Sequence, residues 1–237
     1  SRGLGDVYKR LFYFLCGCKG INISWAAQIF RQINANFCTF FCFMCTKTSK
    51  VMKRIAILAS GEGTNAENII RYFSERKTAK VVVVITNKAQ AGVLNRADKL
   101  GIPTEFIPAQ DFTEGRALEV LHRYQTDFIA LAGFLLRVPD DILHDYPNKI
   151  VNIHPALLPK FGGKGMYGNR VHEAVIAAAE KESGITIHFI NGHYDEGDTI
   201  FQATCPVMPN DTPETLAARV HALEYEHFPQ VIEKILM

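Results

Sequence analysis

The sequence predicts an α/β fold in which a mostly parallel, twisted sheet carries helices on both faces. Apolar runs such as Val81–Ile85 lack the polar alternation of a half-buried strand and are typical of strands buried on both sides. Helical stretches separate these runs along the chain, and Gly and Pro residues stand at their ends. Strands and helices that alternate in this way build a parallel sheet with helical layers on either side.

The first half of this pattern is regular. After the first strand, a helix is expected to run to about Phe73, and Gly101 closes a second helix that begins at Gly92. Pro103 and Pro108 bound the third strand. In order, the strands are expected at 55–59, 81–85, 104–107, 128–132 and 149–153, with a third helix at 115–124.

The second half differs, because two strands follow each other through a polar turn. A helix is expected at 171–179, and strands at 185–190 and 199–205 flank the turn 191–197. This arrangement predicts that the end of the sheet departs from the regular βα alternation of the first half.

A long C-terminal helix ends the chain. Thr212 is expected to cap it, with Pro213 at its first position. Pro229 is expected to kink or restart this helix, because proline removes one backbone donor. The apolar face of the helix is expected to contain Leu216, Val220, Leu223, Val231 and Ile235.

Charge and cysteine content separate residues 1–51 from the rest of the chain. These residues contain seven of the 26 Lys and Arg but one of the 24 acids, which leaves 19 bases and 23 acids in the body. A mildly acidic body is not typical of a nucleic-acid binder. Five of the six cysteines also lie in residues 1–51, so the body, with Cys205 alone, is expected to be reduced and cytoplasmic.

Residues 1–51 show no sustained helical or strand period, and their apolar runs are too short to cross a bilayer. We interpret them as an N-terminal extension outside the fold, translated ahead of a start at Met52, whose removal leaves activity intact. A signal peptide and a cysteine zinc site are the alternatives. The folded domain is expected at 52–237.

A glycine-rich loop, Gly61–Asn65, joins the first strand to the first helix. Glycines leave backbone N–H groups open to a phosphate at a helix N-terminus. With Ala66 the loop also satisfies a loose dinucleotide pattern. A nicotinamide enzyme usually has an acid near the end of the second strand, where this chain has Thr86–Lys88. The sequence therefore favours a single phosphate over a dinucleotide, with a purely structural turn as the alternative.

The stretch Asn152–Pro155 ends the fifth strand. Period two places Asn152 and His154 on the same side, and Pro155 stops the strand at the carboxyl edge of the sheet, where ligands bind. An Asn amide can donate to a developing oxyanion, and a His can carry a proton near neutral pH. Two polar groups in an otherwise apolar strand indicate catalysis, whereas a lone His is more often structural.

Asp195 lies in the polar turn between the last two strands. Near His154, its carboxylate would raise the imidazole pKa and orient the ring. By itself, the pattern favours an ordinary turn residue.

Several motifs together carry a family resemblance. Asn152–Pro159 resembles the signature of folate-dependent formyltransferases, and Gly63–Asn65, Leu131–Phe134 and Tyr194–Gly197 follow in the order expected for that family. The resemblance covers 52–237 and none of residues 1–51. It implies a Rossmann-like formyltransferase domain over 52–237.

The resemblance also implies a role for individual residues. Asn152, His154 and Asp195 match the catalytic trio, with Asn152 and His154 stabilising an oxyanion and relaying a proton, and Asp195 raising the His154 pKa. Glu224 matches a carboxylate that takes ribose hydroxyls, although a solvated helix face would look the same. Gly63, Thr64 and Asn65 match the phosphate loop. The implied folate contacts are Arg116, Leu135, Leu136, Arg137, Val138 and Asn152.

The implied reaction moves the formyl group of 10-formyltetrahydrofolate to the amine of glycinamide ribonucleotide, a step of purine biosynthesis, without a metal. The expected partners are these small molecules alone, without nucleic acid or membrane, in a monomer or weak homodimer. Two alternatives stay open. One is a formyltransferase for another amine, such as a nucleotide-linked amino sugar, and the other is a non-catalytic nucleotide- or folate-binding protein.

Overall fold

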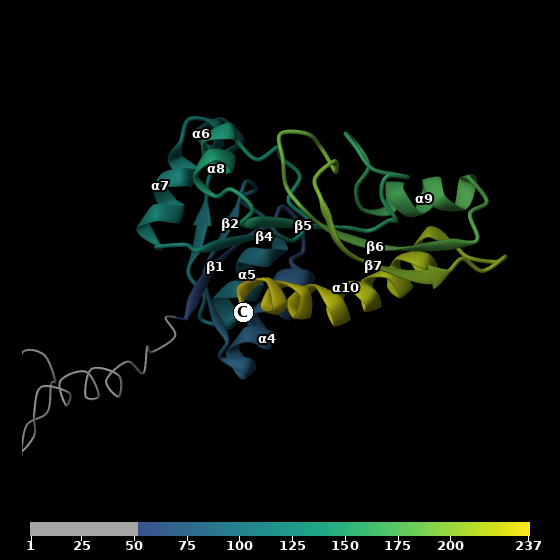
Figure 1. Cartoon of the computed structure of the whole chain (residues 1–237), viewed down its shortest axis with the longest axis horizontal. Coiled ribbons are helices and arrows are strands. Elements are labelled where there is room, and N and C mark those ends of the chain that lie inside the picture. Colours follow the sequence, from purple (N-terminus) through teal and green to yellow (C-terminus); the bar gives the residue numbers. More distant parts are fainter. Residues whose placement is uncertain (1–51) are drawn as a thin grey trace, which may run out of the picture. The chain divides into compact units, whose positions relative to one another are not determined.

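The computed structural model describes residues 52–237 (Figure 1). The predictions for residues 1–51, namely an extension, a signal peptide or a zinc site, lie outside the described residues. Within 52–237, no helix is both long and apolar enough to cross a membrane. In the same range, no group of three or more His, Cys, Asp or Glu side chains is placed to hold a metal ion.

Seven strands form one sheet in the order β3-β2-β1-β4-β5-β6-β7. β1 to β5 pair in parallel, whereas β6 runs antiparallel to β5, and β7 antiparallel to β6. The predicted fold class, a mostly parallel α/β sheet, is confirmed. The strands are β1 (Lys53–Leu58), β2 (Ala79–Thr86), β3 (Thr104–Phe106), β4 (Phe128–Leu131), β5 (Ile150–His154), β6 (Glu182–Phe189) and β7 (Thr199–Pro206).

Helices cover both faces of this sheet. They are α4 (Thr64–Arg76), α5 (Gly92–Lys99), α6 (Ala109–Thr113), α7 (Arg116–Arg123), α8 (Asp140–Asp145), α9 (Asn169–Ala177) and α10 (Pro213–Leu236). Ile55 and Ile57 of β1 share a core with α4, α5 and α10, whereas Ala56 and Leu58 share the opposite core with α6, α7 and α8 (Figure 1). Because alternate residues enter two cores, the parallel strands are continuous apolar runs.

The sequence pattern does not predict α6 and α8. They contain five and six residues, too few to show a helical apolar period. Pro108 and Pro139 precede them, and acidic residues occupy their first turns. These short helices are therefore marked by signals at their N-termini, which a search for periodicity overlooks.

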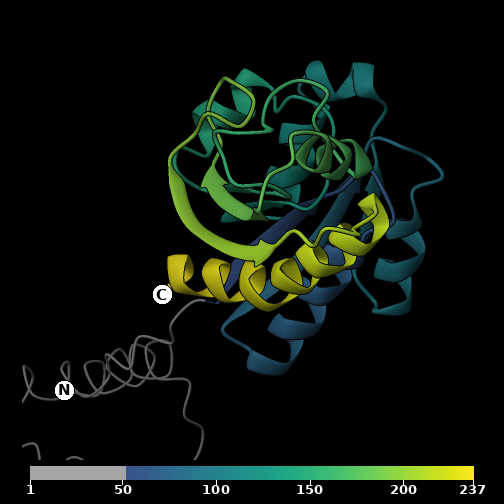
Figure 2. The same ribbon diagram turned by 90° about the vertical axis from the view of Figure 1, so that its right-hand side faces the viewer.

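The long helix α10 runs across one face of the sheet beside α4 (Figure 2). Thr212 caps it through a reciprocal bond with Thr215, and Pro213 occupies its first turn, as predicted. The predicted restart at Pro229 is wrong, because α10 continues to Leu236. Proline leaves the carbonyl four residues earlier, that of Tyr225, without its helical donor, and the Asn68 Nδ2 amide of α4 donates to that carbonyl at 2.8 Å.

This replacement predicts a coupling between Asn68 and Pro229. Asn68→Ala removes the substitute donor and is expected to lower the free energy of unfolding by about 1 kcal/mol, measured by urea denaturation. In a Pro229→Ala background the helix supplies its own donor to Tyr225, so Asn68→Ala is expected to cost clearly less. An equal cost in both backgrounds would contradict the assignment.

Candidate active site

A cavity of about 740 Å³ lies at the carboxyl ends of the parallel strands. The loops after β1, β4 and β5 all line it, as predicted. The loop after β1 is joined to the loop after β4 by a backbone hydrogen bond from Ser60 N to Gly133 O at 3.0 Å. Two further segments, 163–168 and 190–195, complete the walls, and α10 contributes His221 and Glu224.

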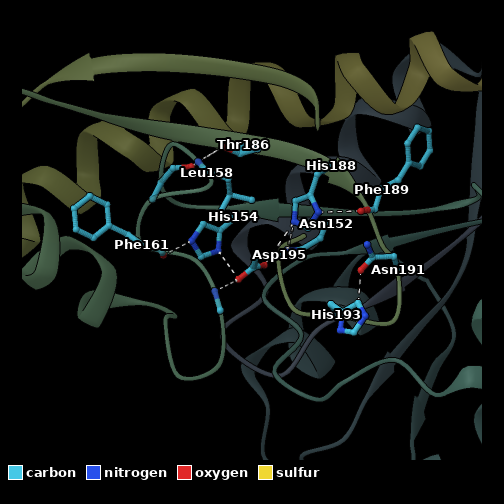
Figure 3. A network of polar contacts seen from close by, with 12 residues as sticks. Asn152, His154, Leu158, Phe161, Thr186, His188, Phe189, Asn191, His193 and Asp195 are labelled. Atoms are coloured by element: carbon cyan, nitrogen blue, oxygen red, sulfur yellow. Dashed lines mark hydrogen bonds and ion pairs between the residues drawn. The ribbon is translucent and has the colours of Figure 1, made fainter. Parts of the chain in front are cut away.

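His154 ends β5 and is 3% exposed. Its Nε2 lies 2.8 Å from the Phe161 carbonyl oxygen, and its Nδ1 lies 3.6 Å from Asp195 Oδ2 (Figure 3). Because a carbonyl oxygen can only accept, Nε2 carries the hydrogen of this bond. A neutral His154 therefore presents an unprotonated Nδ1 to the Asp195 carboxylate.

Asp195 sits in a left-handed backbone conformation, with φ of 56°, in the turn between β6 and β7. The Gly163 N–H donates to its Oδ2 at 2.9 Å, and His188 Nε2 lies 3.6 Å from its Oδ1 (Figure 3). Burial alone would raise the pKa of Asp195, but His188, His154 and the Gly163 N–H outweigh it and hold the pKa below the ordinary value. Asp195 is therefore ionised at neutral pH.

Burial determines the protonation of His154. Removal from water is the largest influence and lowers the His154 pKa, while Asp195 and the Phe161 carbonyl raise it and His188 lowers it. The net pKa lies below the ordinary value of 6.5. Asp195 thus acts in the predicted direction, but desolvation of the imidazolium outweighs the attraction of the carboxylate, so the net shift of the His154 pKa is opposite to the predicted rise.

Asn152 precedes His154 on the same side of β5, as predicted, and both line the cavity. Its Nδ2 lies 3.2 Å from Nε2 of His188, a fully buried residue directly opposite on β6. His188 Nδ1 donates to the Phe189 carbonyl at 2.9 Å, so in the neutral ring Nε2 is the acceptor for the Asn152 amide (Figure 3). This bond fixes which end of the Asn152 amide carries the donors.

The sequence interpretation missed His188 and Thr186, which support the site from β6. Thr186 Oγ1 donates to Ala156 O at 2.7 Å and accepts from Leu158 N at 3.0 Å, so it holds the turn after His154. Both residues stand at alternate positions of an otherwise apolar run. The same signal that identified Asn152 and His154 would have found them.

The loop Gly61–Asn65 leads into α4, with Gly63 as the N-cap at a φ of 76°. A methyl group on Gly63 would lie 2.4 Å from Val93 Cγ2, so the position excludes other residues by conformation and by space. Asn65 Nδ2 donates to Glu224 Oε2 at 2.8 Å, which joins the loop to α10 in the wall of the cavity.

Glu224 is 4% exposed, so the alternative of a solvated helix face is wrong. Burial raises its pKa, although the bond from Asn65 and the proximity of His221 lower it in part. Asn65 Oδ1 is buried and has no hydrogen-bond partner among the described residues. A carboxylate and an unpaired amide oxygen beside a cavity are suited to accept hydrogen bonds from ligand hydroxyls.

The predicted folate contacts divide into two groups. Leu135, Leu136, Arg137 and Val138 all line the cavity, and Arg137 Nε donates to the Gly192 carbonyl at 3.2 Å. Arg116 begins α7, pairs with Asp111 at 3.1 Å and is not among the described residues that line the cavity. The structure gives no support to its predicted folate contact.

Residues 53–232 match the family described as formyl transferase. The chain belongs to the formyl transferase family. It is 40% identical over 191 residues to a chloroplastic phosphoribosylglycinamide formyltransferase of Vigna unguiculata, which covers 77% of this chain and 61% of that protein. It is 35% identical to the phosphoribosylglycinamide formyltransferase of Bacillus subtilis, over 78% of this chain and 95% of that protein.

A solved structure is similar to this chain over a comparable share of its length. The glycinamide ribonucleotide transformylase 1 of Symbiobacterium toebii has a TM-score of 0.73 and 34% identity, over 78% of this chain and 88% of that one. The chain spans less than two thirds of the length of the plant relatives, which are 61% and 65% covered. The segment that matches the formyl transferase family contains every cavity residue discussed above.

The packing of Gly63 predicts the effect of a single methyl group. Gly63→Ala is expected to weaken binding of inorganic phosphate about tenfold or more, because the loop must move away from Val93 and leave its left-handed conformation. Gly61→Ala is the matched control, since no heavy atom lies within 4 Å of its added methyl group. Binding is measured by calorimetry, and equal affinities for the two variants would contradict the assignment of the loop.

His172 of α9 predicts a pH-dependent stability. It is 1% exposed, and burial, followed by His221 and His154, lowers its pKa to about 4. Between pH 6.5 and about 4 the unfolded chain binds a proton that the folded chain excludes, so stability falls as pH falls through this window. The loss is expected to approach about 3 kcal/mol at pH 4.

The test compares urea unfolding of the wild type and His172→Asn at pH 7 and pH 4. The variant is expected to lose less stability than the wild type on acidification. His144→Asn, at an exposed position of α8, is the control. If all three chains lose the same free energy, His172 is not the titrating group.

Proposed function

We propose that this chain transfers the formyl group of 10-formyltetrahydrofolate to the amine of glycinamide ribonucleotide, a reaction of purine biosynthesis. The observation that carries the proposal is a single cavity lined by His154, Asp195, the loop Gly61–Asn65 and Glu224. Relatives named for this reaction, similar over most of residues 52–237, support it. Formyl folate as donor and a cytoplasmic location belong to the same proposal, as does a monomer or weak homodimer.

The two substrates take opposite ends of the cavity. The acceptor places its phosphate on the loop Gly61–Asn65, where the N–H groups and the helix dipole of α4 favour an anion. Its ribose hydroxyls reach Glu224 and the unpaired Oδ1 of Asn65. The folate ring system lies against Leu135–Val138, under the segment 191–195 that Arg137 holds in place.

Formyl transfer then proceeds through a tetrahedral intermediate. The amine nitrogen forms a bond to the formyl carbon, the carbonyl π pair moves to oxygen, and the Asn152 amide donates to that oxyanion. The unprotonated Nδ1 of His154 takes a proton from the amine, and Asp195 stabilises the imidazolium that forms. His154 stabilises the oxyanion in this form, then passes the proton to the folate nitrogen as the carbon–nitrogen bond breaks.

The two alternatives predict different results. A formyltransferase for a nucleotide-linked amino sugar keeps the catalytic trio but needs a larger acceptor site, whereas the loop Gly61–Asn65 suits a small phosphorylated acceptor. A non-catalytic binding protein has no use for an ionised carboxylate next to a buried imidazole. The decisive assay supplies 10-formyltetrahydrofolate with glycinamide ribonucleotide or with an amino-sugar nucleotide. Formylation of the sugar alone, or of neither amine, would refute the proposal.

Removal of the His154 imidazole or of the Asp195 charge is expected to slow turnover. His154→Ala and Asp195→Asn are each expected to lower kcat about tenfold to a thousandfold, the range for lost acid–base or oxyanion groups. His122 and Asp145 provide a matched control, because they form an exposed His–Asp pair that does not line the cavity. His122→Ala and Asp145→Asn are expected to keep wild-type turnover, and a similar turnover for all four variants would contradict the mechanism.

A further inference from the structure

We propose that Arg96 of α5 is a positioning residue for the loop Gly61–Asn65, which it shapes for phosphate from outside the cavity. This inference rests on the phosphate role proposed above for the loop. Arg96 is not among the described residues that line the cavity. It acts on the proposed phosphate site through the main chain and through one acidic side chain.

One guanidinium contacts both parts of the site. Arg96 Nε donates to the carbonyl oxygen of Glu62, between the two glycines of the loop, at 2.8 Å. Its Nη1 lies 2.5 Å from Oε2 of Glu67, in the first turn of α4. The planar fork of Arg thereby ties the middle of the loop to the start of the helix, which a lysine ammonium cannot do with the same geometry.

The rest of α5 contacts the loop at the residues on either side of Glu62. Val93 N donates to the Gly61 carbonyl at 3.2 Å, and the Val93 side chain fills the space next to Gly63. Arg96 follows Val93 by three residues, so both lie on the same face of the helix. Because glycines make a loop conformationally free, these contacts reduce the entropy lost when its N–H groups converge on an anion.

Arg96 also offsets the negative charge of Glu67, which would oppose the binding of a phosphate group. Glu67 lies close to the α4 N-terminus, where its carboxylate would repel a phosphate group. Hydrogen bonds from Arg71 and Arg96 are the main influences on Glu67 and hold its pKa below the ordinary value, so the carboxylate is charged. Both arginines therefore offset this charge, but Arg96 alone also contacts the loop.

This difference provides a matched pair of variants. Arg71→Ala removes one partner of Glu67 and leaves the contact between Arg96 and the loop. Arg96→Ala removes a partner of Glu67 and the loop contact together. Arg96→Ala is expected to weaken inorganic phosphate binding and to raise KM for glycinamide ribonucleotide about tenfold, with kcat and KM for the folate within about twofold. Arg71→Ala is expected to stay within about twofold of the wild type in all four measurements.

Arg96→Lys keeps the charge without the fork and is expected to fall between the wild type and Arg96→Ala. It also serves as the test if Arg96→Ala does not fold. Phosphate binding is measured by calorimetry, apart from the activity assay. If the wild type binds phosphate but transfers no formyl group, a weaker Arg96 variant still supports the inference while the proposed function fails. If the Arg96 and Arg71 variants bind phosphate equally well, the inference is overturned whatever the activity.

Discussion

The site depends on keeping the Asp195 carboxylate charged while it is mostly shielded from water. A buried carboxylate without partners would take up a proton or destabilise the fold. Here the Gly163 N–H and two imidazole rings surround Asp195 and keep its pKa low. The same glycine-rich segment holds His154 through the Phe161 carbonyl. Because residues 161–163 contact both His154 and Asp195, a movement of this segment would change the charges of these two side chains as well as their geometry.

The change of strand direction at β6 is what makes this arrangement possible. An antiparallel neighbour places His188 and Thr186 directly across the ladder from Asn152 and His154. Thr186 then holds the turn after β5, and His188 orients the Asn152 amide and approaches Asp195. A parallel neighbour of β5 would end at the same edge and lead into a loop there. The antiparallel end of the sheet thus supplies rigid partners for Asn152 and His154, the proposed catalytic side chains.

Local sequence patterns predict the strands and much of the cavity lining. Strands buried on both faces are continuous apolar runs, and tight turns contain glycines, so both can be recognised from the sequence. Local patterns fail where the deciding contact lies far along the chain. Pro229 ends no helix because Asn68, far away in the sequence, donates to the freed carbonyl. Glu224 on an amphipathic helix is indistinguishable from a solvated acid until α10 is packed beside α4. The protonation of His154 depends on the burial of its ring, which no local motif specifies.

The pKa values of two carboxylates at the cavity, Asp195 and Glu224, are shifted in opposite directions, which suits the two groups to different roles. Asp195 accepts from the Gly163 N–H, lies beside two imidazole rings and stays ionised, so it can stabilise a proton on His154. Glu224 has the Asn65 amide as its hydrogen-bond donor, and burial raises its pKa. Hydroxyl groups of a ligand would add the donors that Glu224 lacks and lower its pKa. On the proposed function, an acceptor with hydroxyl groups would therefore favour the charged form of Glu224.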